Sequence, residues 1–402
     1  MHRARGDLER ALAAHDESLA VRRRLLALDP ARPEWLRDLS VSLDRVGDVH
    51  RARGDLERAL AAHEESLSLV RRLLALDPAR PEWLRDLSVS LDRVGDVHRA
   101  QGDLERALAA YDESLAVRRR LLALDPARPE WLRDLSASLD RVGDVHLAQG
   151  DIERALTAYG EGLSLVRRLL ALDPARPEWL RDLSVSLDRV GDVHRAQSDL
   201  ERALAAYDES LAVRRRLLAL DPARPEWLRD LSASLDRVGD VHLAQGDIER
   251  ALTAYGEGLS LVRRLLALDP ARPEWLRDLS LSLDRVGNVH RAQGDIERAL
   301  TAYGESLSLV RRLLALDPAR PEWLYDLAVS LSRQAMSAEA TGRPADALSF
   351  WKAALDELDD LTRRPAPLAD WNTAATACRR AISRVEATLH PSGGGRGGPP
   401  PG

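Results

Sequence analysis

The stretch Leu-Ala-Leu-Asp-Pro-Ala-Arg-Pro-Glu-Trp-Leu at residues 26–36 recurs every 48 residues along nearly the whole chain. The copies are marked by the tryptophans Trp35, Trp83, Trp131, Trp179, Trp227, Trp275 and Trp323. A fixed period of this size is typical of a repeat array, in which each unit covers its apolar face by packing on its neighbours. The period therefore predicts a solenoid, which grows by stacking units rather than by enlarging one core.

Residues 33–78 show the pattern of one unit. Pro33 suits the first turn of a helix, Gly54 can end that helix in the left-handed conformation, and Asp55 can cap a second helix. The apolar face of the first helix carries Leu36, Leu39, Leu43, Val46 and His50, spaced three and four apart. The second helix buries Leu56, Ala59, Leu60, His63, Leu67, Val70 and Leu74. We therefore expect a hairpin of two helices, each of roughly 20 residues.

The centre of the hairpin reads Leu91-x2-Val94-Gly95-x2-His98, then Gly102, then Ala107-x3-Tyr111. It resembles the tetratricopeptide repeat, whose 34-residue pattern is Trp-x2-Leu-Gly-x2-Tyr, Ala-x3-Phe and a terminal proline. The unit here is longer, and a continuing helix at 117–122 replaces that proline. The resemblance covers roughly residues 1–365. It implies an all-α, right-handed solenoid of antiparallel hairpins, with small residues such as Gly95 where two helices approach closely.

Composition excludes several classes of protein. The 402 residues carry a formal net charge of −6 and no long basic run, which argues against nucleic acid or a membrane surface as partner. No apolar run reaches the roughly 18 residues of a membrane span, and the N-terminus lacks a signal-peptide core. Lys352 is the only lysine among 59 basic residues, which we interpret as the codon bias of a bacterial genome. The single cysteine, Cys378, excludes an intrachain disulfide and indicates a reducing compartment, the cytoplasm.

The pattern divides the chain into four parts. We expect an orphan second helix at 1–31, seven hairpins at 32–364 with the last one divergent, a capping helix at 365–390, and a disordered Gly/Pro-rich tail at 391–402. Within the array, residues 101–196 and 197–292 differ at only three places, which indicates a recent duplication of a two-repeat block. The differences are Gly102 against Ser198, Val185 against Leu281, and Asp192 against Asn288.

The first residue raises a question about the start of the chain. Met1 stands where the next copy has Val49, and a GTG codon encodes valine but can also be read as a bacterial start. We therefore hypothesise that the chain is a fragment of a longer array. The alternative is a true start that exposes the orphan helix. An in-frame stop codon just upstream of Met1 would exclude the fragment.

The resemblance implies a ligand groove on the concave surface, lined mainly by the first helix of each hairpin. The polar stripe at the right spacing carries Arg37, Val41, Asp44, Asp48 and Arg51. Its copies give one acidic ladder of Asp44, Asp92, Asp140, Asp188, Asp236 and Asp284, and a second of Asp48, Asp96, Asp144, Asp192 and Asp240, which Asn288 interrupts. Beside them run Arg51, Arg99, Arg195 and Arg291. We expect this stripe to bind a peptide or protein with basic groups. The alternative is a solvated face on which Asp and Arg neutralise each other across repeats.

Other repeated residues are interpreted as structural. The histidines from His50 to His290 and the tryptophans fall on packing faces. Equivalent histidines lie about 10 Å apart, too far to share a metal ion. The arginine clusters, such as 118–120, are expected on a solvated face. The chain has no phosphate loop, HExxH or GxSxG motif, so we expect no metal, no cofactor and no catalysis.

The sequence thus predicts a protein–protein interaction scaffold or sensor module. The alternative is the regulatory portion of a larger bacterial signalling or defence enzyme whose catalytic domain lies upstream of Met1. A third hypothesis is an oligomer that forms through the exposed N-terminal helix.

Overall fold

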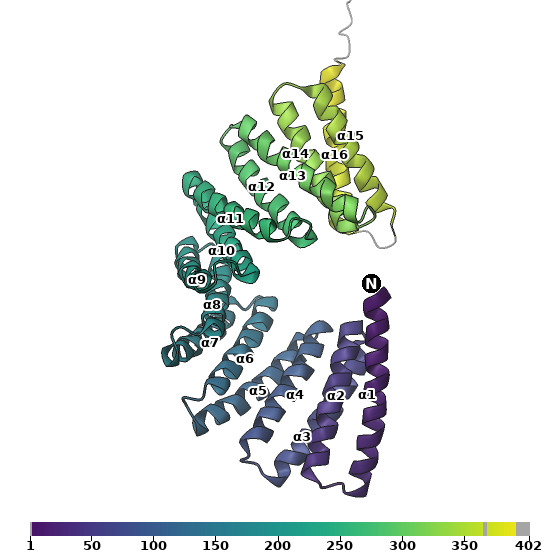
Figure 1. The fold of residues 1–402 in the computed structure, drawn as a ribbon, viewed down its shortest axis with the longest axis vertical. Coiled ribbons are helices and arrows are strands. Elements are labelled where there is room, and N and C mark those ends of the chain that lie inside the picture. The colour runs from purple at the N-terminus through teal and green to yellow at the C-terminus, as the bar shows by residue number, and fades with distance from the viewer. Residues whose placement is uncertain (1, 365–367, 391–402) are drawn as a thin grey trace, which may run out of the picture. The chain divides into compact units, whose positions relative to one another are not determined.

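The computed structural model describes residues 2–364 and 368–390, and all regular structure in these ranges is α-helical (Figure 1). The first nine helices are α1 His2–Leu28, α2 Pro33–Arg53, α3 Leu56–Leu76, α4 Pro81–Ala100, α5 Leu104–Leu124, α6 Pro129–Ala148, α7 Ile152–Leu172, α8 Pro177–Ala196 and α9 Leu200–Leu220. They are followed by α10 Pro225–Ala244, α11 Ile248–Leu268, α12 Pro273–Ala292, α13 Ile296–Leu316, α14 Pro321–Ala340, α15 Pro344–Thr362 and α16 Ala369–Leu389. The predicted all-α fold of tandem antiparallel hairpins is confirmed.

The chain divides into two compact units, residues 1–213 and 214–402, and the division falls within α9. In the first unit α2 pairs with α3, α4 with α5 and α6 with α7, while α1 packs on α2. In the second unit the pairs are α10 with α11, α12 with α13 and α14 with α15, and α16 packs on α15. Each unit is therefore a stack in which every hairpin contacts the next.

Proline and glycine set the ends of the helices as the sequence predicts. Arg32 before Pro33 is extended, with φ −69° and ψ 115°, because the proline ring disfavours a helical residue before it. Gly54 ends α2 with φ +79°, a conformation that glycine adopts without steric cost. In α1, by contrast, the helix runs from His2 without a break at Gly6 and Asp7, which align with Gly54 and Asp55. The expected cap by Asp55 makes no side-chain bond to the helix, whereas Asp103 accepts one from the Arg106 backbone N–H.

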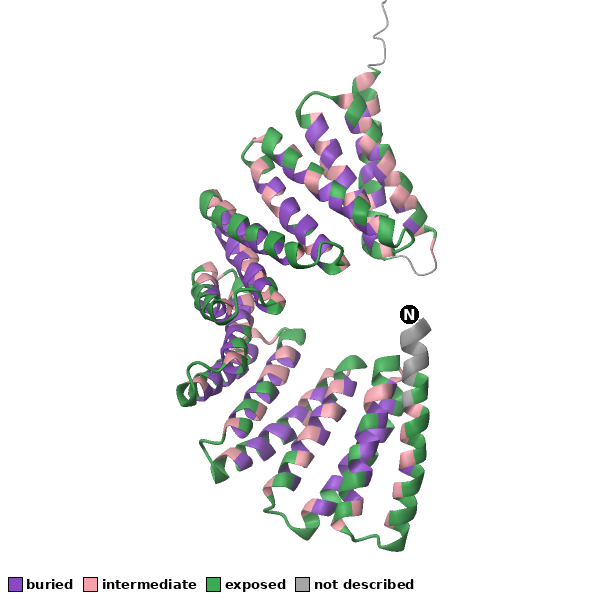
Figure 2. Ribbon diagram, viewed as in Figure 1, coloured by how far each residue is buried: buried purple, intermediate pink, exposed green. Residues whose placement is uncertain are grey.

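The two helices of a hairpin touch most closely at a glycine. A Cβ atom on Gly95 would lie 2.6 Å from Cε1 of Tyr111, closer than two carbon atoms can approach. The same geometry recurs at Gly143 with Tyr159. Tyr111 is fully buried, and each helix in the array buries one stripe of residues (Figure 2). The predicted role of Gly95 as a close-approach residue is confirmed.

The last helices form a core of their own composition. Trp351 of α15 and Trp371 of α16 are buried together with Cys378. The outward residues of α16, such as Thr373 and Arg380, are exposed. The expected tail at 391–402 lies outside the described residues.

Candidate functional site

We call the copies of Arg37, Val41, Asp44, Asp48 and Arg51 on the first helices the polar stripe. In the first unit they lie on α2, α4, α6 and α8, and in the second on α10 and α12. The structure places them at three depths. The arginines at the Arg51 position are exposed, the carboxylates at the Asp48 position are half-buried, and most of those at the Asp44 position are buried.

The carboxylates at the Asp44 position pair with arginines of the next first helix. Arg93 Nη1 lies 2.6 Å from Asp44 Oδ2, and Arg141 Nη1 lies 3.2 Å from Asp92 Oδ2. In the second unit Arg285 pairs with Asp236 at 2.7 Å and Arg333 with Asp284 at 2.5 Å. Arg93, Arg141 and Arg285 each come directly after an aspartate of the stripe, whereas Arg333 comes after Ser332. The predicted stripe did not include these arginines. These partly buried ion pairs connect neighbouring hairpins.

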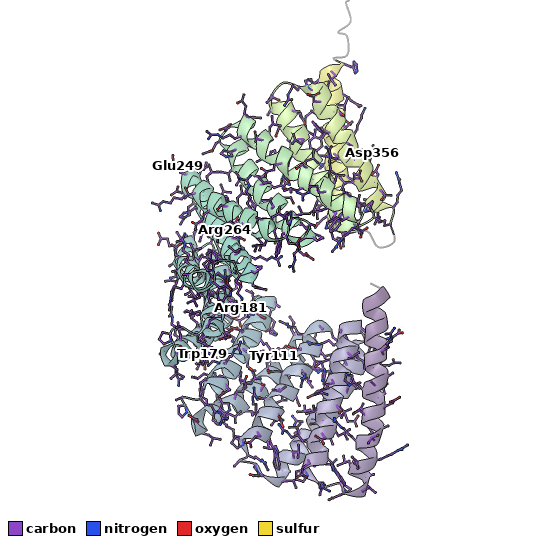
Figure 3. The ribbon with its side chains drawn as sticks, in the orientation of Figure 1. Tyr111, Trp179, Arg181, Glu249, Arg264 and Asp356 are labelled. Atoms are coloured by element: carbon purple, nitrogen blue, oxygen red, sulfur yellow. The ribbon has the colours of Figure 1, made fainter. Side chains whose placement is uncertain are left out.

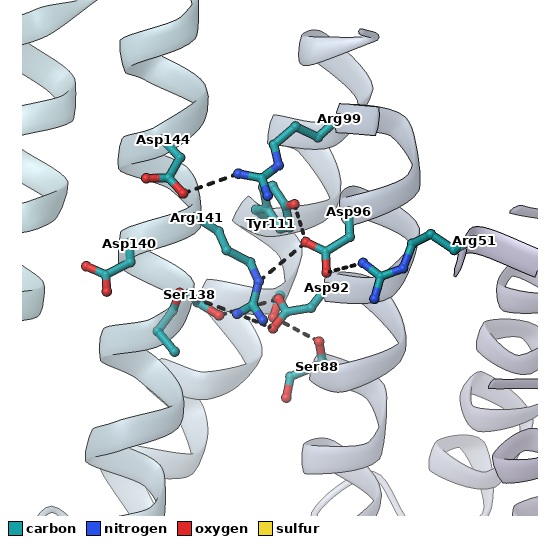
Figure 4. Close-up of polar contacts among 12 residues, drawn as sticks. Arg51, Ser88, Asp92, Asp96, Arg99, Tyr111, Ser138, Asp140, Arg141 and Asp144 are labelled. Carbon is teal, nitrogen blue, oxygen red and sulfur yellow. Dashed lines mark hydrogen bonds and ion pairs between the residues drawn. The ribbon is translucent and has the colours of Figure 1, made fainter. Parts of the chain in front are cut away.

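The carboxylates at the Asp48 position accept hydrogen bonds from buried tyrosines. The hydroxyl of Tyr111 donates to Asp96 over 2.6 Å, while Arg51 Nη1 lies 3.4 Å from the same carboxylate (Figure 4). The same bond joins Tyr159 to Asp144, Tyr207 to Asp192, Tyr255 to Asp240, and Tyr303 to Asn288. Burial and the adjacent Asp96 raise the pKa of Tyr111, so its hydroxyl keeps the proton that it donates.

The first arginine of the 118–120 cluster is buried, contrary to prediction, and so is its copy Arg214. Arg118 of α5 is 4% exposed, and its Nη2 lies 2.7 Å from Asp92 Oδ2. Its Nη1 donates to the backbone oxygen of Asp134 over 2.7 Å and to Ser138 Oγ. Its neighbour Arg119 is exposed as expected. Every third or fourth residue of α5 faces inward, and Arg118 is one of these residues.

Asp140 has a longer ion pair than Asp44, Asp92, Asp236 and Asp284. Its Oδ1 is buried and has no hydrogen-bond partner among the described residues, a property that it shares with Asp284 (Asp140 is labelled in Figure 4). Arg189 stands 3.8 Å from its Oδ2, because Arg189 donates instead to Asp144 Oδ1 over 2.9 Å. Burial raises the pKa of Asp140 to about 6. An adjacent pocket of about 470 Å³ opens between α6 and α8, and Asp140 lines it.

The repeated aromatic residues and histidines pack as predicted. Trp179 is buried at the start of α8, with the Arg176 guanidinium 4.7 Å from its ring centroid (Figure 3). His50, His98, His146 and His242 are buried on the helix faces between hairpins. Within the described ranges, no group of three histidine, cysteine, aspartate or glutamate side chains comes together as metal ligands would. None of the described helices has both the length and the apolar character of a membrane span.

Comparisons with known proteins agree with this architecture. A tetratricopeptide repeat model matches residues 38–120 and 86–168, and a second tetratricopeptide repeat model matches 1–31, 184–223 and 280–318. Among solved structures, the apo form of RapI is 10% identical with a TM-score of 0.52, over 96% of this chain and 99% of RapI. BtubC (BKLC) from P. vanneervenii is 20% identical with a TM-score of 0.50, over 66% of this chain and 93% of BtubC. Both are similar in fold alone. No curated protein sequence matches the chain.

Proposed function

Because this chain belongs to the tetratricopeptide repeat family, we propose that it is an interaction scaffold that binds a protein or peptide along the polar stripe of its first helices. The fold of this family is typically a non-catalytic scaffold. The observation that carries the proposal is the pocket of about 470 Å³ between α6 and α8, which opens on the stripe. A concave site with apolar walls and a few polar groups is the usual form of a binding site.

The side chains around this pocket support contact with a partner. Val185 is 38% exposed, although it lies on a first helix whose neighbouring residues Ser184 and Ser186 are buried. Arg51 and Arg99 of the same stripe extend into solvent and reach carboxylates of the next helix only through 3.4 and 3.2 Å ion pairs. Exposed ion pairs of this kind contribute little to stability, so a partner's charged groups can replace them with little loss of free energy.

Charge reversal of the stripe carboxylates would not identify the binding site. Replacing Asp140, Asp144, Asp188 and Asp192 with lysine would remove a partner's basic contacts if these residues were exposed. Asp144 and Asp192 accept buried tyrosine hydroxyls, however, and Asp188 is 4% exposed. Charge reversal there would break the packing of the array, so loss of binding would not identify the site.

A photo-crosslinker on the stripe tests the proposal directly. We would place p-benzoylphenylalanine at Val185 of α8 in the full chain, and at the exposed Thr157 of α7 as a matched control on a second helix. We expect a specific crosslinked partner from the source cell at Val185 and not at Thr157. Equal crosslinking at the two positions, or crosslinking at Thr157 alone, would move the binding surface away from the stripe.

We also propose that the protein works in the cytoplasm. Its one cysteine, Cys378, is buried, and burial raises the pKa of the thiol, which keeps it in the unreactive protonated form. Such a thiol suits a reducing compartment. Recovery of the native protein from an extracytoplasmic fraction of the source cell would contradict this assignment.

A further inference from the structure

The pocket between α6 and α8 has a mixed lining with one unsatisfied carboxylate oxygen. Ala137 and Val185 contribute apolar walls, and Val166 of α7 lies at the base, since it is only 1% exposed. Its polar lining includes Asp140 and Ser186, and also Arg133, Arg181 and Asp182. The Arg133 guanidinium is paired with the Asp182 carboxylate at 2.8 Å, which leaves the Asp182 backbone oxygen as the copy of the Asp134 acceptor. The buried Oδ1 of Asp140 accepts no hydrogen bond from the described residues.

One repeat earlier, an arginine fills the equivalent space. Arg118 stands 48 residues before Val166 and 4% of it is exposed. Its guanidinium contacts four acceptors: the Asp92 carboxylate, the Asp134 backbone oxygen, Ser138 Oγ and, at 3.3 Å, Ser88 Oγ. The carboxylate accepts from one nitrogen at 2.7 Å, and the backbone oxygen from the other at 2.7 Å. The acceptors around Arg118 therefore form a guanidinium site, and a side chain of the same protein occupies it.

The pocket repeats that acceptor set without the arginine. Asp140, Asp182 and Ser186 each follow by 48 residues the acceptors Asp92, Asp134 and Ser138. The arginine position carries Val166 instead. The nearby Arg189 does not replace the missing group, because its Nε stays 3.8 Å from Asp140 and its Nη1 bonds Asp144.

Other hairpins with valine at this position are different. In α3 the residue is Val70, but the Asp44 carboxylate there has Arg93 at 2.6 Å and His63 Nδ1 at 3.4 Å. In the second unit the residue is Val262, and Arg285 lies 2.7 Å from Asp236. At Asp140, by contrast, the position of Arg118 carries Val166. The arginine of the next first helix, Arg189, stays 3.8 Å from the carboxylate.

We propose that the pocket between α6 and α8 binds the guanidinium group of an arginine side chain from a partner peptide. The proposal rests on the proposed function and specifies the chemistry that the stripe recognises. A guanidinium presents several N–H groups in a fixed plane, which suits a carboxylate and two further oxygens around it. Val166, Val185 and Ala137 would cover the methylene groups of the arginine side chain. A lysine ammonium matches this arrangement less well, because it is a compact point charge.

The test uses short peptides and the full chain. The probe is acetyl-Ala-Ala-Arg-Ala-Ala-amide, with citrulline and lysine versions as controls for charge and shape. Binding is followed by NMR of methyl-labelled valines at pH 7.5. The Val185 methyl groups report on this pocket, because the duplicated block has Leu281 there. We expect the arginine peptide to shift the Val185 signals and the citrulline peptide to bind at least about tenfold more weakly, since a bond to a charged group is lost.

One substitution tests the role of the acceptors. Val166→Arg copies Arg118 into the pocket, so we expect it to fold and to abolish binding of the arginine peptide. Circular dichroism establishes that each variant is folded, and Val166→Leu is the control for size.

Two results would overturn the proposal: equal binding of the arginine and citrulline peptides, or unchanged binding to a folded Val166→Arg variant. If the arginine peptide fails while Val185 still crosslinks to a partner, the pocket assignment is wrong and the scaffold proposal stands. If the peptide binds while crosslinking at Val185 does not exceed that at Thr157, the scaffold proposal fails and the pocket remains.

Discussion

The hydroxyl of Tyr111 on α5 donates a 2.6 Å hydrogen bond to the carboxylate of Asp96 on α4. The tyrosine ring packs against Gly95, one residue before its acceptor. The bond therefore fixes both the distance and the rotation of the two helices in the hairpin. A carboxylate that the sequence assigns to a ligand is already in use by the fold.

Removing the tyrosine hydroxyl should cost more at Asp96 than at Asn288. Tyr111→Phe deletes a bond to a charged acceptor, for which we expect about 1.5–3 kcal/mol less stability. Tyr303→Phe deletes a 2.8 Å bond to the neutral amide of Asn288, for which we expect about 0.5–1.5 kcal/mol. Urea denaturation of the full chain measures both. Equal losses would mean that the charge of Asp96 contributes nothing to this bond.

Adding a methyl group at the glycine beside Tyr111 should destabilise the hairpin. In Gly95→Ala the new Cβ would overlap the tyrosine ring, so we expect a loss of about 1–3 kcal/mol in unfolding free energy. Gly160→Ala is the matched control, because nothing lies within 4 Å of its added Cβ. Gly160→Ala should raise the free energy of unfolding by up to about 1 kcal/mol, because alanine has a higher helix propensity than glycine. A neutral Gly95→Ala variant would contradict the close approach of the helices.

Ser198 holds the left-handed conformation that glycine occupies in the other hairpins. Its φ is +61°, whereas Gly102 at the same place has φ +81°. A side chain in this region costs about 1–2 kcal/mol, so Ser198→Gly should stabilise the chain by about 1 kcal/mol. Gly102→Ser should lose a similar amount. Thermal denaturation measures both changes, and a destabilised Ser198→Gly variant would show that the serine compensates through a contact.

Ionisation of Asp140 should reduce stability as the pH rises. Burial raises its folded pKa to about 6, above its unfolded value of about 4. The folded chain therefore holds the proton more tightly between these values, and the loss of stability is complete above pH 6. Asp140→Asn cannot ionise, so we expect it to exceed the parent by up to about 3 kcal/mol at pH 7.5, with the difference shrinking toward pH 4.

Urea denaturation at several pH values measures this difference. Glu153→Gln, at an exposed residue of α7, is the control and should show no pH-dependent gain of this size. A gain for Asp140→Asn that is constant from pH 4 to pH 7.5 would contradict the burial of an ionised carboxylate.

The sequence alone predicts the helices, because residues close in sequence determine where each helix begins and ends. Pro33, Gly54 and the spacing of the leucines specify where each helix starts, stops and faces. The depth of the stripe carboxylates could not be predicted in the same way. It depends on Tyr111, which is 15 residues from Asp96, and on Arg141, which is 49 residues from Asp92. Only the packing of helices reveals which residues reach across those separations.

The arginine clusters show the same limit. Residues 118–120 carry identical side chains, and the sequence favours exposure for all three. The structure buries Arg118 and leaves Arg119 exposed, because the helix turns only one of them toward the Asp92 carboxylate. A helical wheel of α5 places Arg118 beside the buried Ser114 and Leu121, and this was the available signal.

Equivalent positions of two successive repeats carry Arg118 and Val166. The comparison shows that the second helices vary at this position, whereas the first helices keep their acceptors. The acceptors stand on first helices whose sequences are nearly identical from copy to copy, while the residue that fills or empties the space stands on a second helix. Exchange of this one residue fills or empties the space and changes its contacts with the next first helix, while ion pairs between first helices, such as Arg141 with Asp92, remain. Duplication then multiplies the altered repeat, so an array of nearly identical repeats can acquire binding sites that differ from one repeat to the next.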